Sequence, residues 1–119
     1  MGNIKSFKEL KVWQKAHQLA IKIYQITKDF PSEEKFGLTS QIRRAAVSVA
    51  SNIVEGFRRY SNKASKNFYD ISDGSLEELK YQLLLSVELG YIEQNIYNES
   101  LNLAEEISKM LHAWSKTQM

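Results

Sequence analysis

The chain has 119 residues, of which 43% are hydrophobic and 25% charged, and its net charge is +2. This length suits one domain with a core of its own, and the absence of cysteine excludes disulfides and thiolate metal sites. No apolar run approaches the roughly 20 residues of a membrane span, and no secretory signal pattern opens the chain. We therefore expect a cytoplasmic protein that does not associate with membranes.

Apolar residues recur with a period near 3.6 in four segments, which predicts four amphipathic helices. They span about residues 8–29, 38–59, 62–89 and 94–116. Phe30-Pro31 is expected to end the first helix, because proline pushes the preceding residue out of the α region. Gly90 is expected to end the third helix in the left-handed conformation. The short connections predict an all-α, antiparallel up-down four-helix bundle, with residues 1–119 forming a single domain.

Two features of these helices carry further expectations. The second helix is apolar almost all round, since Val47, Ala50 and Val54 widen its inward stripe. Such a helix is either central in the core or buried on two sides, and the second arrangement requires another subunit. Gly74 lies inside the third helix, where glycine costs about 1 kcal/mol relative to alanine, so a close helix crossing is expected there.

Charge is divided unevenly along the chain. Residues 1–66 hold 13 Lys and Arg against 5 Asp and Glu, whereas residues 67–119 hold 3 against 9. This division predicts either a basic surface for an anionic partner or two surfaces that attract each other. The alternative is that the helices simply distribute their charge unevenly.

The basic residues form two groups. Four lysines share one face of the first predicted helix, at spacings of 3, 4 and 7 residues. Three more cations lie at the end of the second helix and just after it. Both groups could follow a phosphate backbone, although a solvated helix face is an equally good interpretation of the lysines. The candidate nucleic-acid-binding residues are Lys8, Lys11, Lys15, Lys22, Arg58, Arg59 and Lys63.

Catalytic and metal-binding patterns are missing from the sequence. His17 and His112 lie far apart and have no ligand partner three or four residues away on the same helix, so no metal is expected. Adjacent carboxylates such as Glu77 and Glu78 point about 100° apart on a helix and cannot act on one bond. The sequence also lacks a nucleophile elbow, a P-loop and a dinucleotide fingerprint. We expect a protein that is not an enzyme and needs no cofactor.

Residues 38–56 resemble the signature of the bacterial four-helix bundle proteins encoded within intervening sequences of 23S ribosomal RNA genes. That family includes the accessory variability determinant of diversity-generating retroelements. Further blocks in the family's order extend the resemblance to residues 7–115, at positions 7–16, 58–63, 74–79 and 89–92. Many members carry proline where this chain has Ala50, so its second helix is expected to be straighter.

The resemblance implies a ring-like homopentamer without catalytic activity. In the retroelement relatives it also implies a basic surface that binds nucleic acid and a reverse transcriptase partner. Five residues of the signature block form either a shared ligand or partner site or a polar network that holds the second helix against its neighbours, and we favour the network. They are Arg43, Arg44, Asn52, Glu55 and Gly56.

The leading functional hypothesis is a non-enzymatic, homo-oligomeric protein that binds nucleic acid, with RNA favoured over DNA. The second is an interaction module that docks a partner such as a reverse transcriptase and binds no nucleic acid itself. The third is a small structural or toxin–antitoxin-like accessory protein. Phosphate contacts make affinity fall steeply with salt, and a hydrophobic docking site does not, so salt dependence separates the first two.

Overall fold

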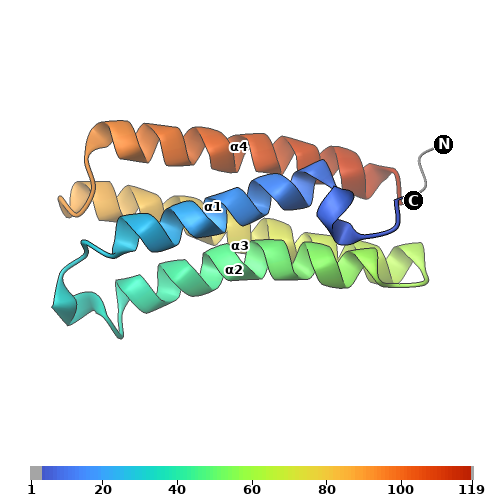
Figure 1. The fold of residues 1–119 in the computed structure, drawn as a ribbon, viewed down its shortest axis with the longest axis horizontal. Coiled ribbons are helices and arrows are strands. Elements are labelled where there is room, and N and C mark those ends of the chain that lie inside the picture. Colours follow the sequence, from blue (N-terminus) through green and yellow to red (C-terminus); the bar gives the residue numbers. More distant parts are fainter. Residues whose placement is uncertain (1–3, 119) are drawn as a thin grey trace.

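Residues 4–118 are described by a computed structural model, in which four α-helices run antiparallel along a shared long axis (Figure 1). The helices are α1 (Lys11–Thr27), α2 (Leu38–Phe57), α3 (Asn62–Glu88) and α4 (Gln94–Lys116). Two short 3-10 helices, η1 (Phe7–Glu9) and η2 (Ser32–Glu34), precede α1 and α2. Over these residues the structure confirms the predicted all-α bundle.

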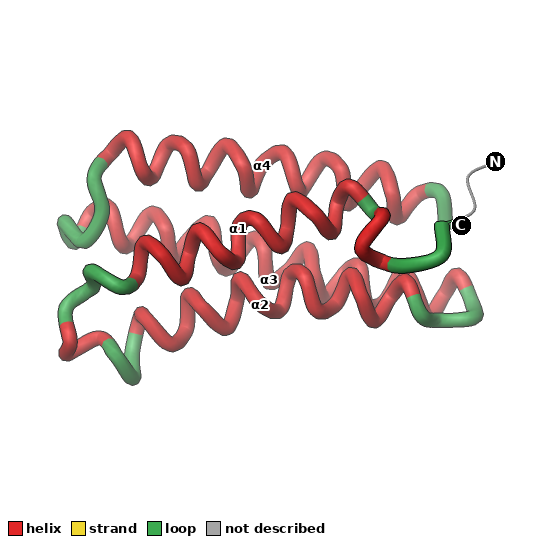
Figure 2. The backbone as a smooth tube through the Cα atoms, viewed as in Figure 1, coloured by secondary structure: helices red, strands yellow, loops and turns green. Residues whose placement is uncertain are grey.

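The connections between helices lie at the two ends of an elongated molecule of 46 × 25 × 20 Å (Figure 2). One end gathers η1, the start of α1, the α2–α3 turn and the end of α4. The other end holds the α1–α2 and α3–α4 connections. The core between them is built from one face of each helix, as the apolar periodicity predicts. Its fully buried side chains include Leu19, Ile23, Ile42, Val49, Ile53, Leu76, Leu79, Leu83, Ile107 and Leu111.

The first helix begins later than the sequence predicts. The Ser6 hydroxyl accepts a hydrogen bond from the Lys8 amide at 3.2 Å, and the Glu9 carboxylate accepts one from the Ser6 amide at 3.1 Å. This reciprocal cap stabilises the start of η1, and the buried, extended Leu10 separates η1 from α1. Lys8 therefore lies outside the first helix, which corrects its predicted place there. The other predicted boundaries agree to within two residues.

The α3–α4 turn confirms the role predicted for Gly90. Its φ of 78° is the left-handed conformation, which L side chains rarely adopt. The amide of Tyr91 donates to the Ser86 carbonyl at 2.9 Å, and the amide of Gly90 donates to the Val87 carbonyl at 3.1 Å. This is the hydrogen-bond pattern of a Schellman cap, which satisfies the last carbonyls of α3.

The close approach predicted at Gly74 occurs at Gly56 instead. A Cβ atom at Gly74 would meet nothing within 4 Å, so the expectation for Gly74 is wrong. A Cβ at Gly56 would collide with the ring of the buried Tyr69, which shows that α3 lies against α2 at this glycine. Serine hydroxyls of α3 stabilise the same contact between the two helices. Ser65 donates to the Gly56 carbonyl at 2.8 Å and Ser72 donates to the Val49 carbonyl at 2.7 Å.

Candidate nucleic-acid interface

Basic side chains concentrate at one end of the bundle, which we call the basic end. It comprises residues 4–11, 55–66 and 113–118, and these segments hold eight Lys and Arg against two Asp and Glu. The corresponding segments at the opposite end, residues 25–41 and 85–97, hold two against five. The fold thus converts a charge difference along the sequence into one along the bundle axis.

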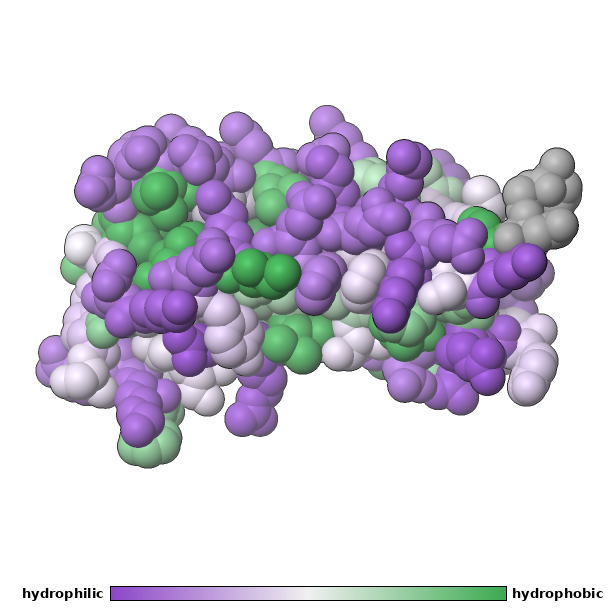
Figure 3. All heavy atoms as spheres, viewed as in Figure 1, coloured by the Kyte–Doolittle hydropathy of each residue, from purple (hydrophilic) through white to green (hydrophobic). Residues whose placement is uncertain are grey.

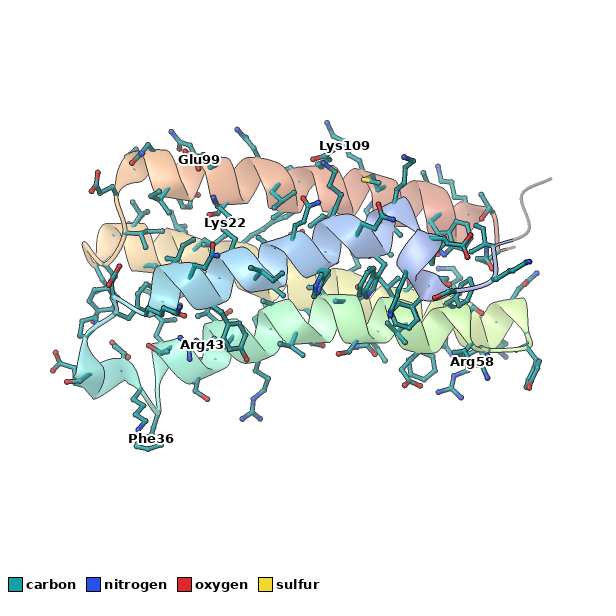
Figure 4. All side chains as sticks on the ribbon, in the orientation of Figure 1. Lys22, Phe36, Arg43, Arg58, Glu99 and Lys109 are labelled. Carbon is teal, nitrogen blue, oxygen red and sulfur yellow. The ribbon has the colours of Figure 1, made fainter. Side chains whose placement is uncertain are left out.

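Several cations of the basic end are free to meet a ligand. Lys8, Lys11, Arg58 and Lys63 are exposed, and within residues 4–118 none of them forms an ion pair. In Figure 4 Arg58 projects from the end of α2, away from the helices. These four residues are the part of the predicted basic set that the tertiary structure leaves unpaired.

Arg59 is engaged within the protein. Its guanidinium pairs with the Glu55 carboxylate one turn earlier on α2. The same guanidinium lies over the ring of Phe68 on α3, 4.5 Å from the ring centroid. Both contacts hold the side chain against the bundle surface, so Arg59 also serves the packing of α2 against α3.

Two lysines of the predicted stripe on the first helix face α4. Lys15 pairs with Glu106 at 3.5 Å, and Lys22 pairs with Glu99 at 3.2 Å, as the labelled pair in Figure 4 shows. The stripe is therefore not a uniformly free surface, because its middle borders a helix rich in carboxylates. Part of the charge division along the sequence therefore reflects attraction between two surfaces of the same chain, on α1 and α4.

The polar residues of the signature block make contacts within the chain. The Arg43 Nε donates to the Thr27 hydroxyl at 2.7 Å, and its guanidinium lies 4.6 Å from the centroid of the Tyr24 ring. Asn52 donates through Nδ2 to the Ser48 carbonyl at 2.8 Å. The Ser48 hydroxyl in turn meets the Ser75 hydroxyl of α3 at 2.7 Å. These contacts tie α2 to α1 and α3.

Arg44 differs from its neighbour, because its side chain is exposed and makes no ion pair within residues 4–118. It borders a shallow surface depression beside Tyr24, Lys35 and Phe36. Phe36 projects from the α1–α2 connection (Figure 4), with 89% of its surface exposed. The signature block thus combines positions that hold the fold with Arg44, which faces solvent and has no ion-pair partner in residues 4–118.

An apolar groove of about 660 Å³ runs between α1 and α2 on the face shown in Figure 3, where hydrophobic residues gather between polar borders. Val47, Ala50 and Val54, which widen the apolar surface of α2, line it, as expected of a helix with a second apolar side. On the α1 side it is lined by Ile21 and Tyr24, which are 46% and 42% exposed. Apolar periodicity predicts that Tyr24 faces the core. In the structure its ring lines the groove instead, so the sequence alone underestimates the apolar surface on the α1 side.

The described residues contain neither a cluster of candidate metal ligands nor a helix that could span a membrane. Residues 4–118 contain no cluster of three or more His, Asp and Glu side chains that could hold a metal ion. None of their helices combines the length and apolar character that crossing a bilayer demands.

The fold and the surface together place this protein in the class of small all-α bundles, here with a basic end and an apolar groove. The chain belongs to the 23S rRNA-intervening sequence protein family, whose model matches residues 8–113. A similar solved structure is a protein with unknown function from the S23 ribosomal protein family of Bacteroides thetaiotaomicron, 29% identical, with a TM-score of 0.82. The match covers 88% of this chain and 95% of that one.

The family match confirms the resemblance that the signature block indicates. The family is not a known enzyme family, and the similar solved protein is itself of unknown function. No curated protein matches the sequence.

Proposed function

We propose that this protein is a non-enzymatic, homo-oligomeric bundle that binds nucleic acid through its basic end, with RNA favoured over DNA. The observation that carries the proposal is the excess of eight cations over two carboxylates in the segments that meet there. Phosphate backbones are bound mainly by such clusters of Lys and Arg, with little dependence on sequence. The exposed Arg58, Lys63, Lys8 and Lys11 supply the contacts in this proposal.

Assembly into a homo-oligomer is part of the same proposal. The apolar groove between α1 and α2 supports it, because the apolar side chains of Ile21, Tyr24 and Val47 line it and remain exposed. We propose that a second copy of this chain covers the groove, with five subunits favoured by the family resemblance. A ring would repeat the basic end once per subunit, so weak phosphate contacts would add through effective concentration.

The binding proposal is tested by fluorescence anisotropy with labelled single-stranded RNA, single-stranded DNA and duplex DNA over a series of salt concentrations. We expect binding at low salt and a log–log salt slope of about 0.7 per phosphate contact on single strands or 0.9 on duplex DNA. Reversing two charges at the basic end, Arg58→Glu with Lys63→Glu, should abolish binding while helicity and oligomer size stay unchanged.

The matched control reverses one exposed lysine at the opposite end of the bundle, Lys35→Glu, and should weaken binding far less than Arg58→Glu alone. Lys15→Glu is a poorer probe, because it would place a carboxylate beside Glu106 and disturb the α1–α4 contact. If the wild-type protein binds none of the three nucleic acids at low salt, the proposal is wrong.

The second candidate function is a docking module for a protein partner such as a reverse transcriptase. The apolar groove favours it, since an amphipathic helix of a partner fits a groove between two helices. Binding of that kind depends weakly on salt. A partner complex that survives high salt, together with absent nucleic-acid binding, would select this function over the first.

A further inference from the structure

The aromatic ring of Tyr60 stands free at the basic end. Tyr60 lies in the turn between α2 and α3, and its exposure of 103% means that no other residue covers its side chain. Its ring therefore contributes nothing to the packing of the bundle. The other tyrosine near this turn, Tyr69, is buried in the core beside Gly56.

Two unpaired cations flank this ring along the chain. Arg58 and Lys63 are both exposed, and neither forms an ion pair within the described residues. Arg59, the immediate neighbour, is turned onto the Phe68 ring and paired with Glu55. The turn consequently presents an uncovered aromatic face, with one unpaired cation two residues before it and another three residues after it.

This combination matches the chemistry of an unpaired nucleotide. A base stacks on an aromatic face, and the phosphates on either side of it attract cations. A duplex buries its base faces in its own stack, so it can use the cations of the turn but not the ring. We propose that Tyr60 is a base-stacking residue that makes the basic end prefer single-stranded nucleic acid over duplex. The inference rests on the proposed function and adds the substrate class to it.

The test compares wild type, Tyr60→Ala and Tyr60→Phe by anisotropy with a labelled single strand and a duplex of the same length. We expect Tyr60→Ala to lose about 5- to 150-fold in affinity for the single strand, the range for one stacked base, and less than about 2-fold for the duplex. Tyr60→Phe keeps the aromatic face and should retain the affinity. Tyr81→Ala, which removes a tyrosine 61% exposed in the second half of α3, is the matched control and should change neither affinity.

Salt dependence separates stacking from charge. Tyr60→Ala should leave the salt slope for the single strand unchanged, because stacking releases no counterions, whereas Arg58→Ala should reduce it by about 0.7. If wild type binds and Tyr60→Ala binds single strands equally well, the inference fails while the proposed function stands. If wild type binds no nucleic acid, the proposed function fails and the inference fails with it.

Discussion

Two glycines inside helices have opposite surroundings, and the difference sets opposite effects for the same substitution. Gly56→Ala would drive a Cβ atom into the Tyr69 ring, and overpacking of this kind costs about 1–3 kcal/mol. Gly74→Ala adds a Cβ to open space on an exposed helix surface, which should stabilise the protein by about 0.5–1 kcal/mol. Urea unfolding followed by circular dichroism measures both changes.

Gly90→Ala completes that comparison, because it forces a side chain into the left-handed conformation at about 1–2 kcal/mol. From most to least stable, the expected order is Gly74→Ala, then wild type, and then Gly56→Ala and Gly90→Ala. A stabilising Gly56→Ala would mean that α2 and α3 do not approach as closely as described.

The adjacent arginines Arg43 and Arg44 should also respond differently to truncation. Arg43→Ala removes the donor to the buried Thr27 hydroxyl and should lower the free energy of unfolding by about 1 kcal/mol. Arg44→Ala removes an exposed side chain without an ion pair in the described residues and should change stability by less than about 0.5 kcal/mol. Thermal unfolding of the two variants side by side measures the difference.

Arg44→Ala also serves as a functional probe of the signature block. If it keeps its thermal stability and yet loses nucleic-acid binding, Arg44 belongs to the binding surface, and the preference for a purely structural signature is overturned.

At the scale of elements, Glu34 joins three segments at the end opposite the basic end. One carboxylate oxygen accepts from the Leu38 amide at 3.0 Å, which satisfies an amide in the first turn of α2. The other accepts from the Tyr91 hydroxyl at 2.8 Å, which reaches over from the α3–α4 connection. The Leu38 amide, followed by the Tyr91 hydroxyl, lowers the pKa of Glu34 below its ordinary value.

A lowered pKa means that the folded state binds the Glu34 proton less readily than the unfolded chain does. The stabilisation is therefore present above the unfolded pKa of about 4.3 and is lost as pH falls through the lower folded pKa. We expect Glu34→Gln to be less stable than wild type near neutral pH, and the difference to shrink below about pH 4. Urea unfolding at several pH values tests this. A difference that stays constant with pH would show that the charge of Glu34 has no part in these contacts.

At the scale of the whole molecule, the position of Val54 distinguishes assembly from folding. Val54 is half-buried and lines the groove between α1 and α2, whereas Val49, on the same helix, is fully buried in the core. Val54→Asp should weaken the proposed assembly and leave helicity intact, because its carboxylate is desolvated only when another subunit covers the groove. Val49→Asp should unfold the chain. Light scattering and circular dichroism on both variants report the two effects.

A wild-type protein that scatters as a 13.8 kDa monomer at micromolar concentration would contradict the assembly proposal directly. A Val54→Asp variant that keeps its oligomeric mass would instead show that the groove is not the contact between subunits.

The sequence by itself determines the helices, their order and most of their inward faces. Apolar periodicity is a local property, so it assigns Leu19, Ile42, Leu79 and Ile107 to the core without knowledge of how the helices pack. The same holds for Gly90, whose place after a long apolar helix is a local signal. The reciprocal cap of Ser6 and Glu9 is local as well, because its spacing marks the start of the short helical turn that holds Lys8.

Only the tertiary structure decides which residues face a neighbouring helix and which face solvent. Lys11 and Lys15 carry the same signal on one helix, yet Lys15 meets Glu106, which lies 91 positions further along the chain. The effects of alanine at Gly56 and Gly74 likewise cannot be ranked from the sequence. They differ because α3 packs against α2 and the Tyr69 ring fills the space at Gly56. The basic end has the same origin, since its three segments become neighbours only when the helices fold back on one another. Periodicity gives each residue a direction around its own helix, whereas contacts between distant segments depend on how the helices pack.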